Sequence, residues 1–129
     1  MISTHRVLVV EDDLEIRESL MEILEENGYQ PVGASNGYEG LAKLRTFEEP
    51  PCLILLDLMM PVMDGRMFRQ EQLRRPEFAS IPVVVLSAYR NVAEETKDMS
   101  VAAFLKKPMK LDDVLGVVRK HCPGHSMAS

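Results

Sequence analysis

Short apolar runs alternate along the chain with segments in which apolar residues recur at helical spacing. The apolar runs predict strands that are buried on both faces of a sheet, at residues 6–10, 31–34, 52–56, 81–86 and 101–105. The segments between them predict helices, at residues 16–27, 38–44, 67–75, 91–99 and 111–118. Five repeats of strand then helix predict an α/β fold, in which helices cover both faces of a parallel sheet.

The size and composition of the chain favour one globular domain. Its 129 residues include 46% hydrophobic and 27% charged residues, which is enough apolar surface for one core. We expect a domain at residues 1–121 and a flexible tail at 122–129, because the tail is small and polar. The two cysteines, Cys52 and Cys122, do not indicate a disulfide framework.

The net charge and the absence of targeting signals argue against nucleic-acid binding, membrane insertion and secretion. A formal net charge of −5 argues against direct binding to nucleic acid, which needs clustered Lys and Arg. The apolar runs are far shorter than the roughly 20 residues that span a bilayer, so membrane insertion is not expected. The sequence also has no secretory signal, and we therefore expect a cytoplasmic protein.

Polar residues follow the predicted strands directly. Glu11 and Asp12 follow the first strand, Asp57 the third, Ser87 the fourth and Lys107 the fifth. In an open parallel sheet, ligands bind beyond the carboxyl ends of the strands, where the strand order reverses. If the order is 2-1-3-4-5, these five side chains share one shallow pocket.

Three crowded carboxylates and one lysine suit phosphoryl transfer. A hard divalent cation relieves the repulsion between carboxylates, and Mg²⁺ (or Mn²⁺) prefers such oxygen ligands. Lys107 and Ser87 would contact the phosphoryl oxygens, and Asp57 is the predicted nucleophile of an acyl phosphate. Asp13 is predicted to begin a helix instead of binding the metal, because acidic residues favour helix N-termini.

Four segments of the chain resemble the receiver domains of two-component response regulators, over about residues 6–121. They are Val7-Leu8-Val9-Val10-Glu11-Asp12-Asp13, Leu56-Asp57-Leu58-Met59-Met60-Pro61-Val62-Met63-Asp64-Gly65, Val85-Leu86-Ser87-Ala88 and Phe104-Leu105-Lys106-Lys107-Pro108. Each pattern alone is weak, but all four occur in order and at predicted strand ends. The resemblance, which extends to stand-alone chemotaxis-type receivers, implies a flavodoxin-like (βα)5 fold with a doubly wound five-stranded sheet in the order 2-1-3-4-5.

The resemblance also implies a role for each site residue. Asp57 would be the phosphoacceptor, Lys107 the phosphate-contacting base, and Ser87 the switch hydroxyl. Glu11, Asp12 and Asp57 would bind Mg²⁺ together with the backbone carbonyl of Met59. Phe104, where a tyrosine often stands in the family, would turn inward when Ser87 moves toward the phosphoryl group.

The function implied is a phosphorylation-dependent signalling switch. A histidine kinase or histidine phosphotransfer protein would phosphorylate Asp57, and the face formed by the fourth helix, fifth strand and fifth helix would then control a downstream output protein. The chain would be no conventional enzyme, because it would assist only its own phosphorylation and dephosphorylation. Two alternatives remain: a pseudo-receiver that binds a partner without phosphorylation, and an aspartyl-phosphate phosphatase. The phosphatase usually needs a second acid two residues after the nucleophile, where this chain has Met59.

Overall fold

Strands and helices alternate along the whole of the chain that the structure describes, residues 5–122 of a computed structural model. The strands are β1 (Arg6–Val10), β2 (Gln30–Ala34), β3 (Leu53–Asp57), β4 (Val83–Ser87) and β5 (Ala103–Lys106). The helices are α1 (Leu14–Glu26), α2 (Gly37–Thr46), α3 (Gly65–Leu73), α4 (Val92–Thr96) and α5 (Leu111–His121). All ten predicted elements are therefore present, with ends that differ by a few residues.

The five strands form one parallel sheet in the order β2-β1-β3-β4-β5. The strand β1 pairs with both β2 and β3, so the direction in which the chain adds strands reverses between β1 and β3. This confirms the predicted fold class and places the switch point beside the ends of β1 and β3. Within residues 5–122, no helix has the length and apolar character that a bilayer span requires.

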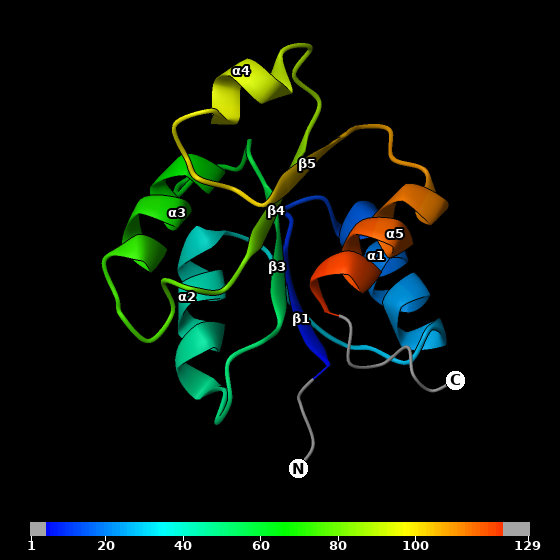
Figure 1. Ribbon diagram of the computed structural model, residues 1–129, viewed down its shortest axis with the longest axis horizontal. Coiled ribbons are helices and arrows are strands. Elements are labelled where there is room, and N and C mark those ends of the chain that lie inside the picture. Colours follow the sequence, from blue (N-terminus) through cyan, green and yellow to red (C-terminus); the bar gives the residue numbers. More distant parts are fainter. Residues whose placement is uncertain (1–4, 123–129) are drawn as a thin grey trace.

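Two apolar cores hold helices on opposite faces of the sheet. In Figure 1, α2 and α3 lie on one side of the strands, and α1 and α5 lie on the other. Alternate residues of β3 contribute to each core: Ile54 and Leu56 to the first, Leu53 and Leu55 to the second. All residues of β3 are buried, as the uninterrupted apolar run predicts for a central parallel strand.

Aspartate and asparagine side chains begin three of the helices. The Oδ1 atom of Asp13 accepts a hydrogen bond of 3.1 Å from the Ile16 amide, and Asp64 accepts one of 2.9 Å from the Met67 amide. Asn36 caps α2 in the same way. Each cap satisfies an amide that has no partner within its helix. Asp13 thus has the predicted helix-start position, because its carboxylate faces its own helix.

The helix α4 is shorter than the predicted segment 91–99. Two backbone carbonyls beyond its end accept hydrogen bonds from a side chain of α3 instead of from helix amides. Arg69 donates from Nε to Met99 O at 2.9 Å and from Nη2 to Ser100 O at 2.7 Å. Ser100 also has a φ of 56°, in the left-handed region, which ends a right-handed helix. Tertiary hydrogen bonds therefore replace the last helical turn.

The cysteines contradict the expectation that Cys52 and Cys122 form no disulfide. The structure joins Cys52, which precedes β3, to Cys122, the C-cap of α5, in a disulfide bond. The residues are 70 positions apart, but α5 runs back along the sheet and ends beside the start of β3. Cys122, which the sequence assigned to the tail, is buried, and residues 123–129 of that tail lie outside the described residues.

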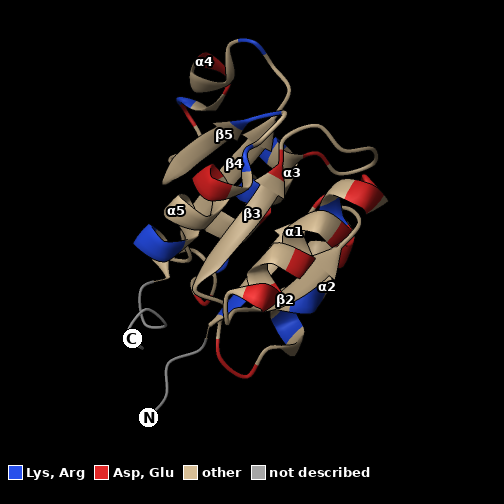
Figure 2. Cartoon of the chain, turned by 90° about the vertical axis from the view of Figure 1, so that its right-hand side faces the viewer, with Lys and Arg blue, Asp and Glu red and all other residues tan. Residues whose placement is uncertain are grey.

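Charged residues of both signs are spread over the face turned toward the viewer in Figure 2. Acidic residues lie along α1, and α5 has Asp112 and Asp113 in its first turn and Arg119 and Lys120 in its last turn. On this face of the described chain, Lys and Arg do not form the continuous stripe that tracks a phosphate backbone. The prediction that the chain does not bind nucleic acid directly stays a prediction.

Candidate functional site

The carboxyl ends of four strands bring the predicted site residues to one edge of the sheet. Asp57 and Ser87 are the last residues of β3 and β4, and Lys107 follows β5 directly. Glu11 and Asp12 follow β1, which pairs with β3. The Lys107 amide donates a hydrogen bond of 2.7 Å to the Ser87 carbonyl, so the ladder continues into the site.

Three carboxylates form a compact cluster at this edge. The ligand atoms of Glu11, Asp12 and Asp57 all lie within 4.8 Å of one another. Glu11 is fully buried and Asp57 is 3% exposed, whereas Asp12 is exposed. The cluster therefore has two carboxylates anchored in the fold and one at its solvent side.

Lys107 reaches across the cluster and contacts both buried carboxylates. Its Nζ lies 2.8 Å from Glu11 Oε1 and 3.4 Å from Asp57 Oδ1. Glu11 Oε1 is buried and accepts no other hydrogen bond within the described residues. One ammonium thus faces three carboxylates, and the cluster keeps a surplus of negative charge.

Burial and the neighbouring charges together shift the pKa values of Asp57 and Lys107. Burial, and then the negative charge of Glu11, raise the pKa of Asp57 from 3.8 to about 8, although Lys107 opposes the shift. Burial by itself lowers the pKa of Lys107, but its hydrogen bond to Glu11 and the charge of Asp57 outweigh that effect and raise it. Without a further cation, ionisation of Asp57 is therefore disfavoured.

The loop after Asp57 is held close beneath it. The Met59 amide lies 3.3 Å from Asp57 Oδ1 as a hydrogen-bond donor, and the Met59 side chain is 53% exposed. Gly65, at the start of α3, packs so closely that a Cβ there would lie 2.6 Å from the Asp57 carbonyl oxygen. A side chain at this position would clash with backbone, so the missing Cβ allows α3 to begin directly under the site.

The two predicted switch residues lie at different depths. Ser87 is buried, and its Oγ accepts a hydrogen bond of 2.9 Å from the Tyr89 amide. Phe104, on the edge strand β5, is 43% exposed and lines a shallow cleft with residues of α4. The hydroxyl therefore belongs to the buried site, whereas the aromatic ring lies on the outer face.

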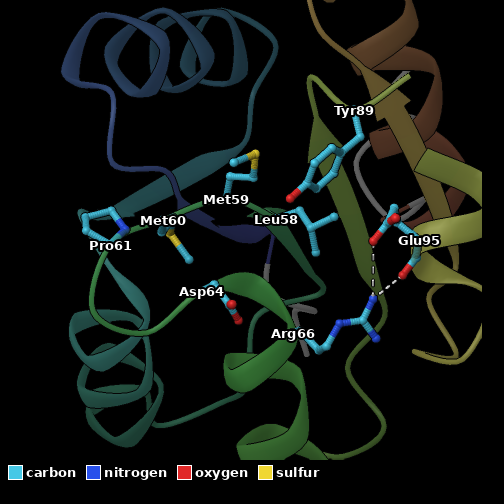
Figure 3. A pocket seen from close by; sticks show the side chains of 8 residues that line it. All are labelled: Leu58, Met59, Met60, Pro61, Asp64, Arg66, Tyr89 and Glu95. Carbon is cyan, nitrogen blue, oxygen red and sulfur yellow. Dashed lines mark hydrogen bonds and ion pairs between the residues drawn. The ribbon is translucent and has the colours of Figure 1, made fainter. Parts of the chain in front are cut away.

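A second cleft of about 360 Å³ adjoins the site, between the loop after β3 and the segment after β4 (Figure 3). Arg66 of α3 crosses it and donates hydrogen bonds to Asp98 Oδ1 at 2.8 Å and to the Glu95 carbonyl. No pattern in the sequence indicated Arg66 or Glu95 as site residues, because Arg66 meets α4 through tertiary packing. Tyr89 was also not predicted, although its position two residues after Ser87 placed it next to the site.

The donor set fits Mg²⁺. Carboxylate oxygens are ligands that Mg²⁺ prefers, and here three carboxylate side chains converge within 4.8 Å. A divalent cation would also balance the surplus charge around the buried Oε1 of Glu11. A doubly wound sheet with acids, a hydroxyl and a lysine at its switch point defines a class of α/β domain that binds its ligand beyond the carboxyl ends of the strands.

Comparison with known proteins agrees with that class. The family model described as "Response regulator receiver domain" matches residues 7–119. The chain belongs to this family.

Individual relatives and one solved structure extend the comparison. Sporulation initiation phosphotransferase F of Bacillus subtilis is 32% identical over 122 residues, which are 92% of this chain and 94% of that protein. Response regulator MprA of Mycobacterium avium is 36% identical over 117 residues, 88% of this chain, but the chain spans only 49% of its length. Among solved structures, Vibrio cholerae chemotaxis protein CheY4 superposes with a TM-score of 0.83, at 26% identity, over 92% of this chain and 99% of that one.

Proposed function

We propose that the chain accepts a phosphoryl group on Asp57 from a histidine kinase or histidine phosphotransfer protein, in a Mg²⁺-dependent step. One observation carries the proposal: Asp57 lies at the strand ends within 4.8 Å of two other carboxylates and 3.4 Å from the Lys107 ammonium. The family, whose members act with histidine kinases and output domains, supports the same reading. The phosphorylated chain then controls a downstream partner through its α4–β5–α5 face.

The transfer forms one bond and breaks one bond. An oxygen of the ionised Asp57 carboxylate attacks the phosphorus of a phosphohistidine, the phosphorus–nitrogen bond breaks, and the departing imidazole keeps the electron pair and takes a proton. Lys107 is near enough to Asp57 to contact a phosphoryl oxygen there, and Ser87, on the neighbouring strand, offers a hydroxyl. Both groups stabilise charge that develops on the phosphoryl oxygens.

Glu11, Asp12, Asp57 and the Met59 carbonyl would hold the metal. Bound Mg²⁺ would neutralise carboxylate and phosphoryl charge, and so keep Asp57 ionised at neutral pH. The buried Glu11 positions this end of the site, because its Oε2 also accepts a hydrogen bond of 3.1 Å from the Asp13 amide. The exposed Asp12 is left to complete the ligand set from the solvent side.

The experiment that tests the function is the intact mass of the chain after incubation with a small-molecule phosphodonor. With Mg²⁺, we expect the mass of one phosphoryl group to be added, and with a chelator in its place we expect no addition. No addition under either condition would overturn the proposal and favour a pseudo-receiver that binds its partner unmodified.

Replacing Asp12 with alanine is expected to weaken Mg²⁺ binding by roughly 10- to 100-fold, because one carboxylate ligand is lost. The fold should persist, since Asp12 is exposed. The affinity is measured by calorimetric titration with Mg²⁺. The control is Asp13→Asn, which removes a neighbouring charge but keeps a side chain that caps α1. An unchanged affinity in Asp12→Ala, or an equal loss in the control, would remove Asp12 from the ligand set.

The switch begins at Ser87 and ends at Phe104. When Ser87 Oγ turns toward a phosphoryl group on Asp57, it leaves the Tyr89 amide that now donates to it. The segment after β4 then shifts, and the exposed Phe104 ring turns inward to fill the space. The α4–β5–α5 face changes its shape in consequence, which supplies the signal.

Replacing Phe104 with alanine is expected to leave phosphoryl uptake within about 2-fold of the natural chain, because the ring lies on the outer face. It should abolish the change in amide hydrogen exchange that phosphorylation causes in α4 and β5. The control is Tyr38→Ala, which removes a similarly exposed ring from α2. If α4 and β5 respond equally in all three proteins, Phe104 has no part in the switch.

A further inference from the structure

A pair of cysteines lies at the end of the sheet opposite to the carboxylate cluster. Cys52 immediately precedes β3, whose other end is Asp57, and Cys122 caps the C-terminus of α5. Their Cα atoms are 5.5 Å apart, within the range of about 4.4–6.8 Å that disulfides span. The two thiols can therefore join without movement of the backbone.

The surroundings of the two cysteines suit both the disulfide and the reduced thiols. Cys122 is 2% exposed and packs into the core between the sheet and α1 and α5. Cys52 is only partly buried, so a small thiol reagent can reach it. The Sγ of Cys52 lies 3.3 Å from the Arg6 carbonyl oxygen, which gives a reduced thiol an acceptor.

The fold has a core that does not depend on a cross-link. Val114, Leu115 and Val118 of α5 are buried, and Val114 and Val118 share a core cluster with Leu20 and Leu24 of α1. Disulfide-dependent domains are those that lack such a core. The bond therefore adds a restraint to a helix that apolar contacts already hold.

We propose that Cys52 and Cys122 are a reversible thiol–disulfide pair, which when oxidised locks the last turn of α5 to the start of β3. The oxidant is a low-molecular-weight disulfide such as oxidised glutathione. The Cys52 thiolate attacks one of its sulfur atoms and releases one thiolate, and the Cys122 thiolate then attacks the mixed disulfide on Cys52 and releases the second. The two protons lost by the cysteines pass to the two released thiolates, and excess reduced thiol reverses both steps.

The position of the pair separates this modification from phosphorylation. Asp57 and Cys52 lie at opposite ends of β3, so the cross-link touches none of the carboxylates or Lys107. It restrains α5, one part of the α4–β5–α5 face. The redox state should thus change the mobility of α5 and not the capacity of Asp57 for phosphoryl transfer.

The test begins with the full chain, reduced and then treated with oxidised glutathione. We expect the intact mass to fall by two hydrogen atoms and both cysteines to resist alkylation after denaturation, until reduced glutathione restores them. A product with glutathione bound to either cysteine, two thiols that still alkylate, or a bond that excess reduced glutathione leaves intact would overturn the proposal.

The lock is tested by hydrogen exchange of the same two forms, without any substitution. In the oxidised form we expect amides of the last turn of α5 to exchange at least ~10-fold more slowly than in the reduced form, and the melting temperature to rise by roughly 10 °C. The matched control is the double variant Cys52→Ser, Cys122→Ser, which should not respond to either glutathione. Equal exchange of α5 in the reduced and oxidised natural chain would refute the lock, whatever the phosphorylation experiments show.

Discussion

We expect the replacement of Asp57 with asparagine to abolish the uptake of a phosphoryl group from a small-molecule phosphodonor, with a loss of at least ~10³-fold. The amide has the size and shape of the carboxyl group but no anionic oxygen, so it forms no stable acyl phosphate. Asp57 ends a strand that is buried along its whole length, and the replacement leaves that packing unchanged. Intact mass spectrometry, with Mg²⁺ present, measures the uptake in both proteins.

The control for this result is Asp64→Asn, a carboxylate-to-amide change at the start of α3. Asparagine still caps a helix, so this variant should take up the phosphoryl group at the rate of the natural chain. Equal labelling of Asp57→Asn and the natural chain would contradict the assignment. Peptide mapping would then identify the acceptor, and Glu11 and Asp12 would be the first residues to inspect.

The same Asp57→Asn change should raise the stability of the metal-free protein at neutral and alkaline pH. In the folded chain the pKa of Asp57 is raised from 3.8 to about 8, by burial and by Glu11. Folding therefore favours the neutral carboxyl, and ionisation opposes folding. We expect Asp57→Asn to be more stable by on the order of a few kcal/mol above pH 8, measured by urea unfolding in a chelator.

The sign of the pH dependence follows from the two pKa values. A raised folded pKa gives a stabilisation that is fully present below pH 3.8 and is lost as the pH rises through about 8. The difference between Asp57→Asn and the natural chain should therefore grow over this window. The pKa of Lys107 is raised above 10.5, so its own contribution persists across the window and does not reverse the trend.

Mg²⁺ and a second variant make this prediction specific. Saturating Mg²⁺ should stabilise the natural chain more than Asp57→Asn and so reduce the difference between them. Glu49→Gln removes one exposed carboxylate elsewhere and should change stability by less than about 0.5 kcal/mol. If the stability of the natural chain in the chelator does not fall as the pH rises from 3.8 to about 8, the carboxylate cluster does not strain the metal-free fold.

Some features of the fold could be predicted from the sequence because they depend on local patterns. The continuous apolar run before Asp57 predicted a strand buried on both faces, and all residues of β3 are buried. Asp13 was predicted to begin a helix because acids favour that position, and it caps α1. The ends of the strands could not be predicted from the apolar runs alone. The hydrogen-bonded ladder between β3 and β4 extends past the apolar run of β3, and Asp57 itself pairs with Leu86.

The candidate site was predictable as a set of residues, but its geometry was not. Alternation of strand and helix implies that strand ends meet at one edge, which brought Glu11, Asp57 and Lys107 to the same place. The bridge from Lys107 to both carboxylates, at 2.8 and 3.4 Å, depends on the path of the segment after β5. The raised pKa of Asp57 depends on burial, which no spacing along the chain specifies.

The order of the elements and the residues that end each strand follow from the sequence alone, because period and polarity are properties of neighbouring residues. The contacts between distant segments depend on the tertiary fold. Arg69 ends α4 early by binding the carbonyls of Met99 and Ser100, about thirty residues away. Cys52 meets Cys122 because α5 runs back along the sheet. Such pairs form when packed helices and strands place two groups within bonding distance, and a one-dimensional pattern carries no record of that distance.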